Sequence, residues 1–394
     1  MNLADRATGI TPSATLAITS KAKQMKKDGV DVISFGAGEP DFDTPEFIKD
    51  ACKKSLDAGF TKYCPSDGII ELKDAIINKL KRDIGIGYDR TQICAAAGAK
   101  HALNLIMQVA VNPGDEVIVP APYWVSYVEM VKMAGGKPVV IETTEETGFK
   151  VNAEMVKNAL TKKTKAIILN SPSNPTGAVY TREELQALVN VLESQDLIII
   201  SDEIYDRLIY DGEIHISIVQ LSEKIAEKTI IVNGLSKTYS MTGWRIGYAA
   251  GPTEIIGLMK KWASHSNSTV TSFVQQASVE ALEGNQSFLT EWVDTFQKRR
   301  DALVKGLNDI PGLSCLTPKG AFYVFPSIKE LIGKELGGKT INGALDLAAY
   351  LLDEYKVAIV PGEAFGAPEN FRMSFATSME NIEKGLERIK KALS

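Results

Sequence analysis

The feature that most constrains the fold of this chain is a series of short, apolar, β-branched segments that alternate with amphipathic helical patterns. Strands are predicted at residues 93–97, 116–119, 139–141, 166–170, 197–201, 229–232 and 246–250. Helical patterns are predicted at residues 122–134, 153–161 and 181–194. Apolar strands separated by amphipathic helices form a mostly parallel sheet that is covered on both faces. The sequence therefore predicts an α/β fold.

The length and charge of the chain limit what else it can be. Its 394 residues suffice for about two or three domains, and a net charge of -5 argues against a nucleic-acid-binding surface. No apolar run is long enough to cross a membrane, and the first residues have no apolar signal core. The cysteines (Cys52, Cys64, Cys94 and Cys315) lack the spacing of metal ligands. We therefore expect a cytoplasmic protein with reduced thiols and no metal, membrane or nucleic-acid partner.

The segment 236–248 follows one predicted strand and leads into another, and it brings a lysine, an arginine and several hydroxyl side chains close together. Its sequence is Ser-Lys-Thr-Tyr-Ser-Met-Thr-Gly-Trp-Arg-Ile-Gly-Tyr. Burial of Lys237 among apolar neighbours would favour its neutral amine, which can form an imine with an aldehyde. Arg245 offers a planar, charged fork for an oxyanion such as phosphate, and Ser236 adds a neutral donor. An imine-forming lysine beside a phosphate site points to pyridoxal phosphate (PLP). The alternative for this segment alone is a surface loop with unrelated charges.

Other predicted strands also end in candidate ligands. Residues 93–97 lead into Gly98-Ala99-Lys100 at the start of a helix, where free backbone N–H groups favour an anion. Residues 197–201 lead into Asp202, whose buried carboxylate would need a partner such as a protonated pyridine nitrogen. Tyr205 follows closely enough to reach the phenolic oxygen of the same ring. Three more candidates are Trp124, which could stack on a ring or simply pack in the core, Asn174, which could donate to a ring oxygen, and the turn-rich loop 36–42.

Together these motifs resemble the class I/II, fold-type I PLP-dependent aminotransferases. The shared patterns are Ser-Lys-x-x-x-Met-x-Gly-x-Arg-x-Gly at 236–247, Asn-Pro-x-Gly at 174–177, Asp-Glu-x-Tyr at 202–205 and Gly-Glu-Pro-Asp at 38–41. Their order and spacing match along essentially the whole chain, and the subgroup they resemble most is that of bacterial and archaeal aspartate aminotransferases. The resemblance implies PLP as cofactor and transfer of an amino group from aspartate to 2-oxoglutarate.

The resemblance also implies roles in holding the cofactor. Lys237 would bind PLP covalently and later carry the proton, and Asp202 would keep the pyridine nitrogen protonated. Tyr205 and Asn174 would bind the ring oxygen, while Trp124 would stack on the ring. The residues implied at the phosphate are Gly98, Ala99, Ser236 and Arg245, with Lys100 beside them, and Tyr63 from a neighbouring subunit. A contribution of Tyr63 from a neighbouring subunit implies a homodimer with shared active sites.

For the substrate, the resemblance implies a clamp on the α-carboxylate made by Arg372 and the backbone of Gly38, with Trp124 and Asn174 bordering it. The second carboxylate of aspartate would be bound by Lys100, helped by the hydroxyls of Ser13 and Thr15. These residues are present, so a dicarboxylic substrate is expected. Relatives that also accept prephenate carry a basic residue where this chain has Thr11, which argues against that activity.

The expected organisation is a large PLP-binding domain at residues 47–290 and a smaller α+β domain made from residues 1–46 and 291–394. For the smaller part we predict helices at 14–28 and 379–393 and strands at 320–325, 357–362 and 372–375, with one long helical stretch at 272–310 leading into it. A helix at 45–57 is predicted with Thr44 as its N-cap. Two alternative functions remain: an aminotransferase for alanine, aromatic, kynurenine or prephenate substrates, and a PLP-fold regulator without turnover.

Overall fold

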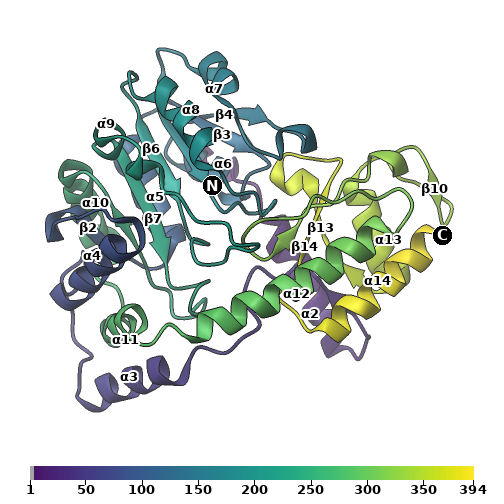
Figure 1. The fold of residues 1–394 in the computed structure, drawn as a ribbon, viewed down its shortest axis with the longest axis horizontal. Helices are drawn as coiled ribbons and strands as arrows, with labels where there is room; N and C mark the ends of the chain where they lie inside the picture. The colour runs from purple at the N-terminus through teal and green to yellow at the C-terminus, as the bar shows by residue number, and fades with distance from the viewer. Residues whose placement is uncertain (1–3) are drawn as a thin grey trace.

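The computed structural model describes residues 4–394 and is built around a seven-stranded sheet. The strand order is β2-β8-β7-β6-β5-β3-β4. Its strands are β2 (Ile93–Ala96), β3 (Glu116–Ala121), β4 (Lys137–Glu142), β5 (Thr164–Asn170), β6 (Ile198–Asp202), β7 (Thr229–Gly234) and β8 (Gly247–Ala250). All neighbouring strands are parallel except β8, which runs antiparallel to both β2 and β7. The predicted α/β fold with a mostly parallel sheet is confirmed (Figure 1).

Helices cover both faces of this sheet because its strands are apolar on both sides. In β5, Ala166 and Ile168 belong to one buried cluster, whereas Ile167 and Leu169 belong to another on the opposite face, as the two-residue period of a strand requires. The surrounding helices are α4 (Ile70–Ile84), α5 (Ala99–Ala110), α6 (Ser126–Met133), α7 (Ala153–Ala159), α8 (Arg182–Leu192), α9 (Glu223–Ala226), α10 (Thr253–Ser266) and α11 (Ser272–Glu283). The sheet therefore has a buried core on each face.

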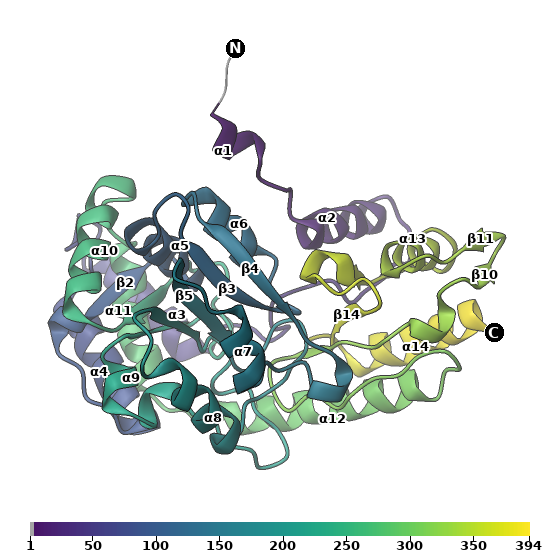
Figure 2. The same ribbon diagram turned by 90° about the horizontal axis from the view of Figure 1, so that it is seen from above.

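A second, smaller region combines the N-terminal segment with the last third of the chain (Figure 2). Strand β1 (Ile33–Ser34) pairs with β12 (Val357–Ala358), and β14 (Phe371–Ser374) lies between β13 (Val360–Pro361) and β9 (Tyr323–Val324). The other elements of this region are α1 (Asp5–Thr8), α2 (Ala14–Lys27), α12 (Phe288–Asn308), a hairpin of β10 (Glu335–Leu336) and β11 (Lys339–Thr340), α13 (Ala344–Tyr355) and α14 (Met379–Leu393). The boundaries 46/47 and 290/291 stay a prediction.

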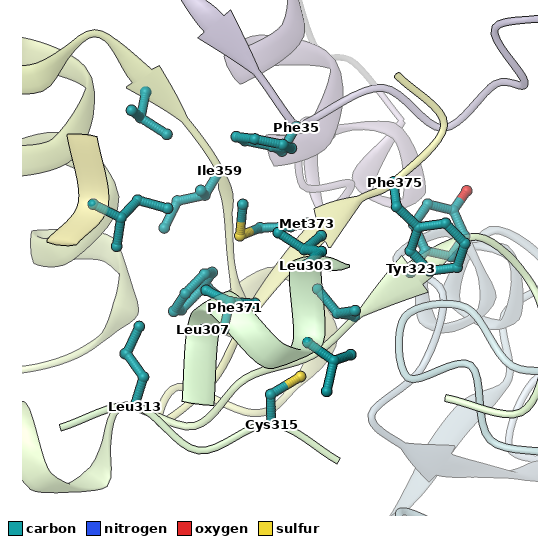
Figure 3. Close-up of a cluster of buried hydrophobic side chains, with 14 of the residues drawn as sticks. Phe35, Leu303, Leu307, Leu313, Cys315, Tyr323, Ile359, Phe371, Met373 and Phe375 are labelled. Carbon is teal, nitrogen blue, oxygen red and sulfur yellow. The ribbon is translucent and has the colours of Figure 1, made fainter. Parts of the chain in front are cut away.

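The core of the smaller region joins residues from both ends of the chain. Phe35, next to β1, packs in the same cluster as Leu303 and Leu307 of α12 and Phe371 of β14 (Figure 3). Gly385 of α14 must be small there, because a Cβ on it would lie 2.3 Å from the ring of Phe35. Burial of these large side chains supplies the free energy that holds the N-terminal segment against the C-terminal third.

The structure corrects three of the expected elements. The stretch 272–310 is divided into α11 and α12, and a Cβ at Gly284 between them would lie 2.5 Å from the carbonyl oxygen of Glu280. The apolar run 357–362 forms two short strands that belong to different sheets. Thr44 is not an N-cap: α3 (Glu46–Asp57) has Pro45 there, and Thr44 Oγ1 donates to the carbonyl oxygen of Ser240 at 2.7 Å.

Within residues 4–394, no helix has the length and apolar character needed to cross a bilayer.

Candidate active site

A cavity of about 450 Å³ lies where the carboxyl ends of β5 and β6 and the segment after β7 meet residues of the smaller region. Most of the predicted site residues line it. They are Thr15, Gly38, Ala99, Lys100, Trp124, Asn174, Asp202, Tyr205, Ser236, Lys237, Arg245 and Arg372. Ligands bind at such strand ends in open parallel sheets. Residues as far apart in the sequence as Thr15 and Arg372 thus share one cavity.

Lys237 follows β7 in a tight turn and points its amine into the cavity. Nζ donates a hydrogen bond to the carbonyl oxygen of Gly38 at 2.5 Å, and the rings of Phe322 and Tyr205 lie 5.8 and 6.0 Å from it. Burial lowers the pKa of Lys237 to about 8, helped by the positive charge of Arg372. A substantial fraction of this amine is therefore neutral near pH 8, so that it can act as a nucleophile or a base.

Asp202 lies at the carboxyl end of β6 and is only 3% exposed. Tyr127 donates to its Oδ2 at 2.7 Å, and the backbone N–H of Ile204 donates to its Oδ1 at 3.2 Å. Burial raises the pKa of Asp202 to about 6, and these two hydrogen bonds oppose that rise. The result is a carboxylate that is ionised at neutral pH, is held in one orientation and borders the cavity.

Arg372 of β14 is a buried cation, 2% exposed. Its Nη1 donates to Asn174 Oδ1 at 2.9 Å, and its Nη2 donates to the carbonyl oxygen of Gly36 at 3.0 Å. The guanidinium lies 4.4 Å from the ring centre of Tyr323. Its Nε has no hydrogen-bond partner, and no carboxylate pairs with it among the residues described. A buried cation with a spare donor is a site for an anion entering the cavity.

The start of α5 and the loop before β8 form a cradle with exposed donors. Gly98 precedes the helix with φ of +89°, and a Cβ there would lie 2.7 Å from Nη2 of Arg245. Gly247 lies against the start of α5, because a Cβ added to it would lie 2.4 Å from the backbone nitrogen of Ala99. Arg245 is held by the carbonyl oxygens of Thr242 and Ala97, at 2.8 and 3.3 Å. The helix N-terminus and this guanidinium together suit a phosphate.

Two pairs of aromatic side chains, Trp124 with Tyr127 and Tyr205 with Tyr323, complete the walls of the cavity. Trp124 packs edge-on against Tyr127, and the Nζ of Lys100 lies 4.8 Å from the ring of Trp124. Burial lowers the pKa of Lys100, and the charge of Arg245 lowers it further. Tyr205 and Tyr323 share a hydrogen bond between their hydroxyls at 3.0 Å. Lys100 is an exposed cation that also lines the cavity.

Some predicted residues lie elsewhere, and some cavity residues were not predicted. Ser13 and Tyr63 do not line the cavity, and Gly98 borders it only through its neighbours Ala99 and Arg245. Tyr63 is 89% exposed. Cavity residues that sequence reasoning missed are Thr19, Lys23, Tyr127, Asn170, Thr242 and Tyr323. Thr242 lies within the segment 236–248, at a position that the motif leaves unspecified. Tyr127 and Tyr323 meet the motif residues only through long-range contacts, which a single sequence does not display.

The donor set fits PLP, the cofactor that the resemblance implies. A partly neutral amine at Lys237 suits its aldehyde, and the buried carboxylate of Asp202 suits a protonated ring nitrogen. The close approach at Gly98 and Gly247 leaves the backbone N–H groups at the start of α5 facing Arg245, as a phosphate would require. The individual roles stay predictions.

Comparison with known proteins places the chain in a family. The model described as "Aminotransferase class I and II" matches residues 30–389. An aspartate aminotransferase of Bacillus subtilis is 52% identical over 99% of this chain and 98% of its own length, and an aspartate/prephenate aminotransferase of Cereibacter sphaeroides is 48% identical over 98% and 97%. The crystal structure of an aspartate aminotransferase from Rhizobium meliloti superposes with a TM-score of 0.97 at 44% identity, covering 100% of this chain and 99% of that one. The chain belongs to the class I and II aminotransferases.

Proposed function

We propose that the chain is an aspartate aminotransferase, which uses PLP to transfer the amino group of L-aspartate to 2-oxoglutarate, giving oxaloacetate and L-glutamate. The observation that carries this proposal is the presence in one cavity of a partly neutral lysine, Lys237, a buried guanidinium, Arg372, and a second cation, Lys100. The strong likeness to curated aspartate aminotransferases supports the same substrate.

The cofactor would be held by residues already in place. Lys237 would bind its aldehyde carbon, and the start of α5 with Ser236 and Arg245 would bind its phosphate. Asp202 would pair with its ring nitrogen, while Tyr205 and Asn174 would bind its ring oxygen and Trp124 would cover the ring. When bound, PLP supplies an electron sink that lowers the barrier to removing the proton from the Cα of the amino acid.

Lys237 is then the group that moves the proton. Because burial lowers its pKa to about 8, its free Nζ can take the Cα proton as a base and return it to another carbon as an acid. The carbonyl oxygen of Gly38, which accepts a hydrogen bond from Nζ, keeps the amine aimed into the cavity. Aspartate and 2-oxoglutarate would use the same site in turn, in two half-reactions.

The substrate would be held by its two carboxylates. Arg372 would bind the α-carboxylate with the spare donor at Nε and the edge of the guanidinium, next to the backbone of Gly38. Lys100 and Thr15, which face the same cavity, would bind the second carboxylate, with Ser13 close to Thr15 in the chain. Holding both ends of the substrate positions its Cα for the amine of Lys237.

We also propose that the enzyme works as a homodimer. Tyr63 is 89% exposed and outside the cavity of its own chain. Other exposed apolar side chains lie on elements near it: Ile70 at the start of α4, and Leu258 and Trp262 on α10. The loop of Tyr63 and α10 are in contact, since Lys260 pairs with Asp67 at 3.2 Å. This apolar surface would be buried against a second copy, which would bring Tyr63 to the phosphate of that copy.

The proposal is tested by the absorbance of the purified protein. With PLP bound it should be yellow, should bleach when aspartate is added and should recover its colour when 2-oxoglutarate is added. Recovery would establish both half-reactions with the acidic substrates. A yellow protein that does not respond to aspartate but bleaches with alanine or an aromatic amino acid would assign it to another substrate class. A protein that never becomes coloured with added PLP would contradict the cofactor.

A further inference from the structure

The cavity contains one cation to which the proposed function gives no task. Lys23 of α2 lines the cavity. No carboxylate lies within ion-pair distance of its Nζ among the side chains that the structure describes. Lys21, on the same helix, differs: its Nζ pairs with Asp353 of α13 at 3.2 Å. Lys23 is therefore a positive charge that faces the ligand space without a partner in the protein.

The position of Lys23 follows from the helical repeat of α2. Thr15, Thr19 and Lys23 are spaced four residues apart, so they lie on one face of the helix, and all three line the cavity. Thr19 Oγ1 donates to the carbonyl oxygen of Thr15 at 2.8 Å. Side chains on a helix lean toward its N-terminus. The long side chain of Lys23 therefore lies over the turn that contains Thr19.

This face of α2 is a close neighbour of the buried guanidinium. A Cβ on Gly36 would lie 3.5 Å from Thr19 Oγ1, and the carbonyl oxygen of Gly36 accepts a hydrogen bond from Arg372 at 3.0 Å. A small molecule whose one carboxylate is bound by Arg372 thus has the hydroxyls and the ammonium of α2 within the same cavity. Two carboxylates of the protein line the same cavity: Glu39, which accepts a hydrogen bond from Thr242 at 3.1 Å, and Asp202, which accepts one from Tyr127 at 2.7 Å.

We propose that Lys23 binds the side-chain carboxylate of the substrate together with Lys100, and so favours dicarboxylic over monocarboxylic substrates. This inference rests on the proposed function. An ammonium on a flexible side chain at the mouth of the cavity pairs with a carboxylate at little cost in its own desolvation. The attraction grows as the bound substrate displaces water between the charges. Because Lys23 is exposed, its contribution should be modest, about three- to tenfold in affinity.

The test uses the PLP-loaded enzyme and succinate, a four-carbon dicarboxylate without an amino group. Calorimetry would measure the Kd for succinate in the wild type and in Lys23→Gln, Lys23→Arg and Lys21→Gln, and steady-state kinetics would measure KM and kcat for aspartate. We expect Lys23→Gln to raise the Kd for succinate and the KM for aspartate about three- to tenfold, with a smaller change in kcat. Lys23→Arg should restore most of the affinity because it keeps the charge. Lys21→Gln is the matched control and should behave as the wild type.

Three other outcomes would overturn the inference, and one would contradict only the proposed function. Equal affinity in Lys23→Gln and the wild type would mean that Lys23 does not contact the substrate. Equal weakening in Lys23→Gln and Lys21→Gln would mean that only the overall charge of α2 matters. Failure of the wild type to turn over aspartate would contradict the proposed function, yet succinate binding would still decide the role of Lys23. A wild type that binds no succinate would overturn both.

Discussion

The two sides of the cavity are built in different ways. On one side, Asn170 and Asp202 are register partners at the ends of β5 and β6, and Lys237 follows β7, the next strand of the sheet. On the other side, Arg372 reaches the carbonyl oxygen of Gly36, which is 336 residues away in the sequence. The first side carries the groups proposed to hold the cofactor and to move the proton, together with Lys100, whereas the second carries Arg372, which is proposed to bind the α-carboxylate of the substrate.

The difference lies in what holds each side in place. The strands of the large sheet are four to seven residues long, and all except the edge strand β4 are largely buried. In the smaller region β9 and β13 have two residues each, so packing within the apolar cluster that contains Phe35 and Phe371 is the main interaction that holds this region together. A rigid sheet suits groups that must keep their orientation. The smaller region, which is held by side-chain packing, can adjust its position to the substrate. Substitutions of Lys237 or Asp202 on the sheet side should therefore change kcat, and substitutions of Arg372 on the other side should mainly change KM.

The largest effect is expected on the sheet side, for Lys237→Ala. Without the amine at this position, no other base in the proposed site can take the Cα proton, so kcat with aspartate and 2-oxoglutarate should fall at least about a thousandfold. Circular dichroism should show a folded protein. Lys298→Ala, on the exposed face of α12, is the control. Activity near that of the wild type would remove Lys237 from the mechanism.

A smaller loss is expected on the other side, for Arg372→Lys. The charge is kept, but the planar fork that reaches Asn174 and Gly36 and offers Nε to a ligand is lost. We expect kcat/KM for aspartate to fall about a hundredfold, mainly through KM. Arg388→Lys, whose guanidinium pairs with Asp31 on the surface, is the control. A fall confined to kcat would contradict the division between the two sides.

The smallest effect is expected for Tyr127→Phe, and it should appear in the pH profile. The hydroxyl of Tyr127 donates to Asp202 and thereby lowers the pKa of that carboxyl, which burial raises to about 6. Removing the donor should raise this pKa further, by about one unit. The ionised fraction of Asp202 then falls at weakly acid pH, so the acid limb of kcat/KM should move to higher pH. At pH 8 the loss should be less than about threefold.

The control for this variant is Tyr350→Phe, since Tyr350 lies on α13 and bonds to the carbonyl oxygen of Ala392. An acid limb that stays where it is in Tyr127→Phe would show that Asp202 does not set the lower pH limit of activity. An acid limb that moves equally in both variants would point to a general loss of stability at low pH.

Sequence reasoning was most successful where function and fold share a local pattern. Asp202 ends β6 and Lys237 comes three residues after β7, so both could be assigned to the carboxyl edge of the sheet, and both line the cavity in the structure. It was least successful where the decisive contact is distant. Tyr127 supports Asp202 from 75 residues away, and Tyr323 meets Tyr205 from 118 residues away. Lys79, buried against Asp206 and Asp83, gave no signal either, because a lysine in a helical pattern is usually exposed.

The sequence by itself determined the parallel sheet, the family resemblance and the residues at its strand ends, because the two-residue period and the motifs are properties of contiguous residues. Only the tertiary structure decided which side chains share a cavity. It set the pKa of Lys237 at about 8, since burial and a nearby cation depend on segments that meet only in the fold. It also turned α2 so that Thr15, Thr19 and Lys23 face that cavity, which the helical period allows but does not require.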